Sequence, residues 1–159
     1  MSLRQREQLG ERVLARAATA DSGALAGTRE ALYLLGPGAP VRIPWEQIHT
    51  ADWDRDTEVL TVVEVGSWGE QRPEHSRTVV DPGRLLDLVR ERITASVLVH
   101  RWVPCGRRGL HLIARRPPAG AGPVTWWYDV PVGVDLSDPA VRAAAERALV
   151  EARAELDEC

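Results

Sequence analysis

The sequence predicts an α+β protein in which several β-strands precede a single helix, twice along the chain. Short runs that alternate in polarity or are rich in β-branched residues fill residues 12–80, and this pattern is typical of strands. An apolar helical period follows, and a second, shorter cycle of strands and one helix completes the chain. The length of 159 residues, with 44% hydrophobic and 27% charged residues, indicates a globular protein and excludes a disordered or collagen-like chain.

The first cycle contains seven expected strands separated by turn-forming residues. Turn-favouring sequences stand at residues 21–23, 36–38 and 54–57. We therefore expect strands at residues 12–18, 24–28, 31–35, 41–45, 49–53, 59–65 and 77–80.

A helix is expected over residues 82–95. Asp81 is a suitable cap, and Pro82 is favoured at the first helical position. The apolar residues that recur at helical spacing, and so form its buried face, are Leu85, Leu86, Val89 and Ile93.

The second cycle is shorter and ends in a longer helix. We expect strands at residues 97–103, 109–115 and 124–130, with a proline- and glycine-rich loop at 117–123. Asp138-Pro139 opens the final helix, whose inward residues are Val141, Ala145, Ala148, Leu149, Ala152 and Leu156. The chain is thus expected to form two units, residues 9–95 and residues 96–159, the second a β-β-β-α unit packed on or beside the first.

Three short motifs of the first unit resemble those of the bacterial pleckstrin-homology-like (PH-like) domains. In that family a Gly-Glu pair leads into the first strand, a Thr-Arg-x-x-Leu-Tyr run forms a central strand, and an Ile-Pro-aromatic-acid-x-Ile run follows. Here the corresponding residues are 10–14 (GERVL), 28–33 (TREALY) and 42–48 (RIPWEQI). The resemblance covers about residues 9–95 and implies a small β-barrel capped by the helix at 82–95.

The resemblance implies a scaffold that binds proteins, peptides or lipid headgroups, and the fold alone does not distinguish among these ligands. The members that bind phosphoinositides use basic residues beside the loop between the first two strands. Here that loop, residues 20–23, has no lysine and contains Asp21. Headgroup binding is therefore not expected at this position.

The charges are unevenly distributed, although the net charge is only −3 and all twenty basic residues are arginine. Residues 97–128 contain no Asp or Glu and carry a charge of +5, whereas the segments before and after carry −3 and −5. Tryptophans lie in the same segment, residues 97–128, which we call the window. The candidate binding residues are therefore Arg101, Trp102, Arg107, Arg108, Arg115 and Arg116.

Two interpretations of this window are open. The arginines and aromatic residues (Trp102, Trp126, Trp127 and Tyr128) could hold phosphates and stack on single-stranded bases, or bind another anionic partner. Alternatively, the tryptophans fill the core of a chain that has no phenylalanine, and the arginines pair with acids of the terminal helix, namely Glu146, Glu151, Glu155, Asp157 and Glu158. The pI of about 5.8 argues against a dedicated nucleic-acid binder.

No metal, cofactor or catalytic site is expected. His100, Cys105 and His111 fall on adjacent predicted strands, but no zinc-binding spacing accompanies them. Cys105, His111 and Asp129 could be drawn as nucleophile, base and orienting group, yet such a triad is defined by geometry. The acidic run at residues 52–58 lacks the glycine and glutamate that a calcium loop requires, so a hairpin turn is expected there.

The sequence therefore predicts a non-catalytic cytoplasmic binding or scaffold module that binds a protein, with homodimer formation left open. The alternative is anion or nucleic-acid binding through the hairpin at 97–128. No apolar run is long enough to cross a membrane, and the first ten residues have no apolar signal segment. The expected contact surface is a barrel edge strand or the exposed face of the arginine-rich hairpin.

Overall fold

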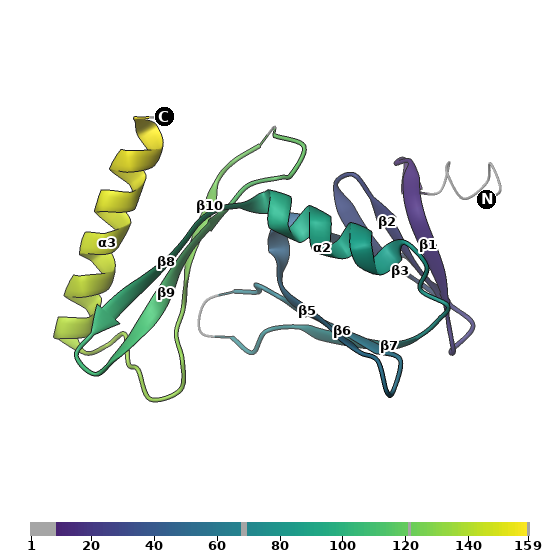
Figure 1. Cartoon of the computed structure of the whole chain (residues 1–159), viewed down its shortest axis with the longest axis horizontal. Coiled ribbons are helices and arrows are strands. Elements are labelled where there is room, and N and C mark those ends of the chain that lie inside the picture. The colour runs from purple at the N-terminus through teal and green to yellow at the C-terminus, as the bar shows by residue number, and fades with distance from the viewer. Residues whose placement is uncertain (1–8, 68–69, 121, 159) are drawn as a thin grey trace. The chain divides into compact units, whose positions relative to one another are not determined.

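The chain folds as a mixed α+β protein, which confirms the predicted fold class. The computed structural model describes residues 9–67, 70–120 and 122–158. It contains two antiparallel sheets and two α-helices (Figure 1). The chain divides between Ser96 and Val97 into two compact units, with residues 117–120 grouped with the first. Each unit has its own sheet, helix and apolar core.

A seven-stranded antiparallel sheet forms the first unit. The strands lie in the order β4-β3-β2-β1-β7-β6-β5, and a short 3₁₀ helix, η1 (Trp45–Gln47), joins β4 to β5. Within the described residues no pairing joins the two edge strands, β4 and β5, so this sheet is open. The seven predicted strands are all present, as β1 (Val13–Thr19), β2 (Ala24–Thr28), β3 (Ala31–Leu35), β4 (Val41–Pro44), β5 (Ile48–Asp54), β6 (Val59–Glu64) and β7 (Glu74–Val80).

Helix α2 (Leu85–Ser96) packs on the core of this sheet through the face that the sequence predicts. Leu85 and Val89 are buried, and Leu86 and Ile93 are half-buried against the same core. The core that they meet is built from alternate residues of the strands, including Leu25, Leu32, Ile43, Ile48, Leu60 and Val79.

The predicted start of this helix at Pro82, with Asp81 as its cap, is wrong. Asp81 and Gly83 have φ angles of 48° and 53°, in the left-handed region. A backbone in that region cannot continue into a right-handed helix. The Leu85 N–H instead closes a turn on the Pro82 carbonyl at 3.0 Å, and the helix begins at Leu85.

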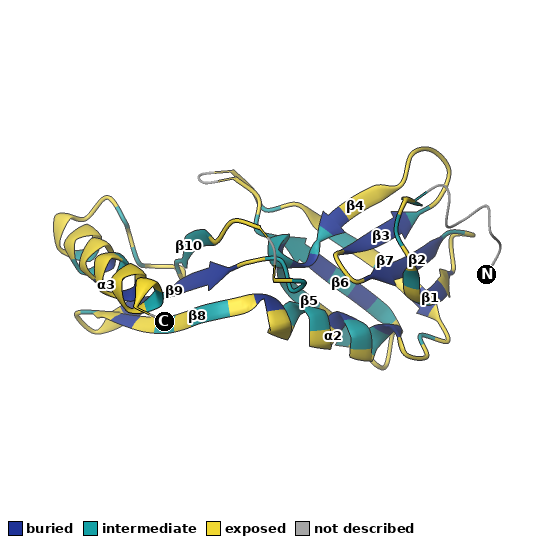
Figure 2. Cartoon of the chain, turned by 90° about the horizontal axis from the view of Figure 1, so that it is seen from above, coloured by how far each residue is buried: buried dark blue, intermediate teal, exposed yellow. Residues whose placement is uncertain are grey.

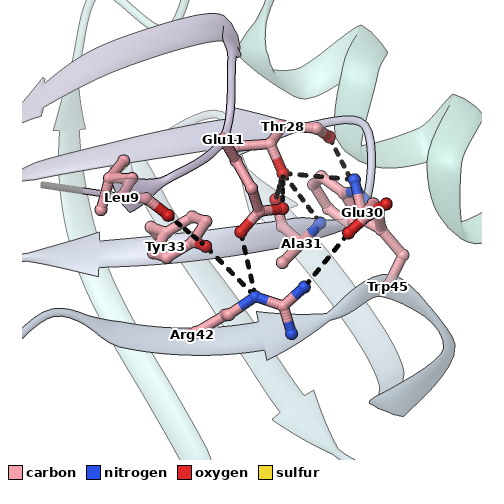
Figure 3. A network of polar contacts seen from close by, with 8 residues as sticks. All are labelled: Leu9, Glu11, Thr28, Glu30, Ala31, Tyr33, Arg42 and Trp45. Atoms are coloured by element: carbon pink, nitrogen blue, oxygen red, sulfur yellow. Dashed lines mark hydrogen bonds and ion pairs between the residues drawn. The ribbon is translucent and has the colours of Figure 1, made fainter. Parts of the chain in front are cut away.

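The indole of Trp45 ties η1 to the turn between β2 and β3. Trp45 is fully buried, and its Nε1 donates to the Thr28 carbonyl at 2.9 Å (Figure 3). The Thr28 hydroxyl accepts from the Ala31 N–H at 3.0 Å and donates to a Glu11 carboxylate oxygen at 2.9 Å. A buried donor left without an acceptor costs about 1–3 kcal/mol, so the Thr28 carbonyl fixes the place of the indole.

Arg42 extends the same network to the surface. Its Nε lies 3.1 Å from Glu11 Oε2 and 3.1 Å from the Tyr33 hydroxyl, and its Nη2 lies 3.6 Å from Glu30 Oε2. These ion pairs are partly exposed and contribute little stability, on the order of 0–1 kcal/mol each. The network draws on all three motifs of the PH-like resemblance (Figure 3), since Glu11, Thr28 and Arg42 come from one motif each.

A three-stranded antiparallel sheet and one long helix form the second unit. Its strands, β8 (Val97–Cys105), β9 (Arg108–Arg115) and β10 (Thr125–Asp129), lie in the order β10-β9-β8, and α3 (Pro139–Asp157) follows. Asp138 caps α3 as predicted, because its side chain accepts from the Ala140 N–H at 2.9 Å and Pro139 stands in the first turn.

Helix α3 packs on one side of this sheet through small residues, and the side of the helix that faces away from the sheet is exposed (Figure 2). The Tyr128 hydroxyl donates to the Ala145 carbonyl at 3.0 Å and links β10 to the helix. Burial, together with the nearby Glu146 carboxylate, raises the pKa of Tyr128, so this phenol remains a donor at neutral pH. The buried cluster consists of Val103, Leu110, Leu112, Ala145, Ala148 and Ala152, with Val141 and Leu149 half-buried against it.

Replacing Trp45 by alanine should strongly destabilise the first unit. The change removes a fully buried indole and leaves the Thr28 carbonyl without its donor, so we expect the free energy of unfolding to fall by about 3–5 kcal/mol. Urea denaturation followed by circular dichroism measures this loss. Trp102→Ala is the matched control, because Trp102 is 52% exposed, and should cost under about 1 kcal/mol. Equal losses at both positions would contradict the role assigned to Trp45.

Candidate binding surface

The sheet of the second unit has two chemically different faces. Side chains alternate between the faces along each strand, and α3 covers the face with the apolar cluster. The strand register places His100 and Trp102 of β8, His111 of β9 and Trp127 of β10 on the other face. We call these four residues the aromatic face.

Trp102 is held in place on the aromatic face while half of its surface stays open. It is 52% exposed, and its indole lies over Gly109 of β9, where a side-chain carbon would overlap the ring. The His111 ring meets the indole edge to face, with centroids 5.0 Å apart, and the His100 and His111 rings lie 4.7 Å apart. Neighbouring rings and the bare backbone at Gly109 thus restrict the orientation of an exposed tryptophan.

Two arginines of the predicted site, Arg101 and Arg108, make contacts within the second unit. Arg101 Nη2 lies 2.5 Å from Glu155 Oε2, one of the helix acids considered from the sequence. Arg108 Nη1 donates to the Val132 carbonyl at 2.9 Å. Strand alternation puts both residues on the α3 side, away from the aromatic face.

The other three arginines do not form a patch. Arg115 is 6% exposed, with its guanidinium 5.4 Å from the centroid of the Trp127 ring, within the range of a cation–π contact. Arg107 and Arg116 are exposed, but they flank β9 at opposite ends, and the eight residues of the strand between them hold them about 30 Å apart. Among the predicted site residues, Trp102 is the one on the aromatic face with a large exposed surface.

The tryptophans of the window have different roles. Trp126 packs against the cluster beneath α3, with the Arg153 guanidinium 5.7 Å from its ring. Core filling therefore accounts for Trp126 and does not account for Trp102.

The polar residues considered as metal ligands or as a triad are separated by the sheet. His100 and His111 come together, but Cys105 packs on the α3 side, with its Sγ 3.6 Å from the Val103 carbonyl. Asp129 pairs in register with His111, on the face opposite Cys105. In the part of the chain that the structure describes, no group of three or more His, Cys, Asp or Glu side chains could hold a metal ion.

The acidic residues at 52–58 close the hairpin between β5 and β6, as predicted. Asp54 Oδ1 accepts from the Thr57 N–H at 3.2 Å and the Asp56 N–H at 2.9 Å. These two bonds, that of Thr57 first, hold the pKa of Asp54 below its usual value. The carboxylate thus serves the turn itself.

A groove of about 490 Å³ lies beside the turns that join β1 to β2 and β3 to β4, with Arg16 as the charged side chain of its lining. In the first of these turns Asp21 accepts from the Thr19 hydroxyl and from the Gly23 N–H. The same bonds, the Thr19 bond first, lower the pKa of Asp21 and keep it ionised. Asp21 Oδ2 also lies 3.8 Å from Arg77 Nε, so the nearby guanidinium of Arg77 already has a carboxylate partner. An ionised carboxylate at this turn repels a phosphorylated headgroup.

Sequence reasoning selected Trp102 but missed the residues that position it, Gly109 and His111. The sequence signal that could have identified His111 is the length of the loop between β8 and β9. Gly106, with a φ of 66°, and the next residue form a two-residue loop, and a loop of this length fixes the cross-strand register. That register sets His111 opposite Trp102.

No match to this chain was found among protein-family models, curated proteins or solved structures. Neither α2 nor α3, the two α-helices within the described residues, has the length and apolar character that a membrane-spanning helix needs.

Replacing Gly109 by alanine should displace the Trp102 indole. The added methyl group overlaps both the ring and the backbone carbonyl oxygen of Val103. We therefore expect a change in the chemical shift of the Trp102 indole N–H from the ring contact, and a loss of about 1–3 kcal/mol in stability that includes the strain at the backbone. Gly36→Ala is the control, since nothing lies within 4 Å of its added carbon. An unchanged Trp102 resonance in the Gly109 variant would show that the indole does not lie over β9.

Proposed function

We propose that this chain is a non-catalytic binding module of the cytoplasm that holds a protein partner at its aromatic face. The observation that carries the proposal is the half-exposed, ring-supported Trp102 over Gly109. Tryptophans of this kind dominate the binding energy of many protein interfaces, because a large apolar area is covered with little loss of side-chain freedom.

The position of Trp102 at a sheet edge supports an extended partner. Trp102 belongs to β8, the strand at one edge of the three-stranded sheet. A partner strand that pairs with such an edge gains backbone hydrogen bonds, and its side chains meet those of the edge strand on each face. The aromatic face would then provide the side-chain contacts that distinguish one partner from another.

We also infer that the first unit is a PH-like domain used as a scaffold, with its barrel left open between β4 and β5. The count and order of its strands, the single covering helix and the shared network of the three motifs support this inference. Scaffolds of this kind present edges and loops to partners, which agrees with a binding role.

The placement of the arginines weighs against an anion or nucleic acid as the partner. Arg101, Arg108 and Arg115 have contacts within their own unit, and Arg107 and Arg116 stand at opposite ends of β9. Nucleic-acid affinity requires several cations along one surface.

The full chain should therefore fail to bind single-stranded DNA or RNA. We expect no change in the fluorescence anisotropy of a labelled oligonucleotide at low salt, where phosphate contacts are strongest. Binding that weakens as salt is raised, and that is lost in Arg107→Gln or Arg116→Gln, would instead favour the nucleic-acid role.

Replacing Trp102 by alanine should release the partner. Loss of a central interface tryptophan costs about 2 kcal/mol or more, so affinity should fall by about 30-fold or more. Quantitative affinity capture with wild-type and Trp102→Ala chains measures the change. Val132→Ala is the matched control, because Val132 is 98% exposed and belongs to the loop before α3. If the Trp102→Ala chain still captures the same proteins, the contact lies on another surface.

A further inference from the structure

We propose that the partner at the aromatic face is a second copy of this chain, paired edge to edge through β8 in antiparallel orientation, with the twofold axis at Arg101. The inference rests on the proposed function and names the occupant of the surface described there. It follows from the free edge of β8, from its charge and from the complementarity of the strand to itself.

The free edge of β8 is limited at both ends. In the described residues β8 pairs with β9 alone, so its other edge offers backbone groups to a further strand. Pro104 near one end has no N–H to donate, and a bulge between Val97 and Val99 distorts the other end. Both features hinder pairing, and they leave residues 99–103 as the segment that can accept a strand.

Charge does not protect this segment from pairing. Edge strands commonly avoid association by presenting charged side chains. Arg101 is the one residue of this segment that carries a fixed charge, and Glu155 of the same unit neutralises it at 2.5 Å. Two copies can therefore approach at Arg101 as two neutral ion pairs.

The segment is complementary to itself when Arg101 lies opposite Arg101 of the second copy. Trp102 then lies opposite His100 of the second copy, and Val99 lies opposite Val103 of the second copy. The aromatic faces join into one continuous stripe, in which cross-strand pairs bring Cβ atoms within about 4.5–5.5 Å. The exposed half of each indole is covered by the imidazole of the other copy.

Neighbouring twofold registers are less favourable. An axis at Trp102 sets Arg101 against Val103 of the other copy, and an axis at His100 sets it against Val99. Each alternative places a guanidinium opposite an apolar side chain. The Arg101 register is the one that pairs like with like on the α3 side and ring with ring on the aromatic face.

Five paired residues from each copy form a contact far smaller than the 20–30 residues a side of a standard interface. The dimer is therefore expected to be weak and to depend on concentration. Light scattering on the full chain should show the mass rising from 17.5 kDa toward twice that value as concentration increases. Trp102→Ala should weaken association by at least about 30-fold.

Cysteine cross-linking tests the register. In an Arg101→Cys chain the two new thiols face each other across the axis, at a spacing that a disulfide can bridge. In a Val99→Cys chain the two thiols are four residues out of register, about 13 Å apart. With oxidised glutathione as the oxidant, we expect the Arg101→Cys chain to form the interchain disulfide at least about tenfold faster. The parent chain, which has Cys105 and Cys159, gives the background rate, and circular dichroism checks that each variant is folded.

The inference is wrong if the wild-type chain keeps the mass of one copy up to about 1 mM, because the free energy of association would then be weaker than about −4 kcal/mol. Equal disulfide rates for the two cysteine variants would also overturn it. So would dimerisation that Trp102→Ala leaves unchanged. A monomer that captures a different protein in a Trp102-dependent way would reject the homodimer and leave the proposed function standing. A monomer without Trp102-dependent capture would reject both.

Discussion

The first unit depends on the buried indole of Trp45, whose N–H donates to the carbonyl of Thr28. The indole fills the core between the sheet and α2, and its N–H needs an acceptor there. The carbonyl that accepts it belongs to the β2–β3 turn, whose own backbone is held by the Thr28 hydroxyl. The backbone N–H of Trp45 also donates to the Glu30 carbonyl of this turn at 3.2 Å, so two bonds from Trp45 hold the 3₁₀ helix against the turn.

This constraint explains why the residues of the PH-like resemblance say more about fold than about ligand. Glu11 and Arg42 are polar and near the surface, where binding residues are commonly sought, yet they bond to each other and to the turn at Thr28. Function has to be sought among residues that the fold does not require. Trp102 satisfies this condition, since its ring covers a glycine and its outer half has no role in either core.

Local signals in the sequence predicted most of the elements. The strands at 24–28 and 31–35 have the predicted bounds, and Asp138 caps α3, because alternation and capping act over a few residues. The prediction of Asp81 as a helix cap was wrong. Its left-handed backbone belongs to the turn that includes Gly83, and an Asp before a proline does not by itself reveal such a turn.

The candidate site was less predictable because its contacts join distant parts of the sequence. Arg101 pairs with Glu155, 54 residues away, and composition alone could not decide between this ion pair and an open basic patch. His111 contacts Trp102 because a two-residue loop sets the register of β8 and β9. The loop predicts this register only once both flanking segments are known to be strands. Charge patterns therefore indicated the segment that contains the candidate surface, and the strand register decided which residue in it is exposed.

Hydrogen exchange at the indole N–H groups tests most directly the claim that one tryptophan holds the fold while another is presented to a partner. Trp→Phe substitutions assign the resonances. The Trp45 indole should exchange as slowly as the most protected backbone amides, because only global opening of the first unit exposes it. The Trp102 indole should exchange at close to the rate of a free indole in a dilute, monomeric sample. Comparable protection at the two positions, or a fast-exchanging Trp45, would contradict the account.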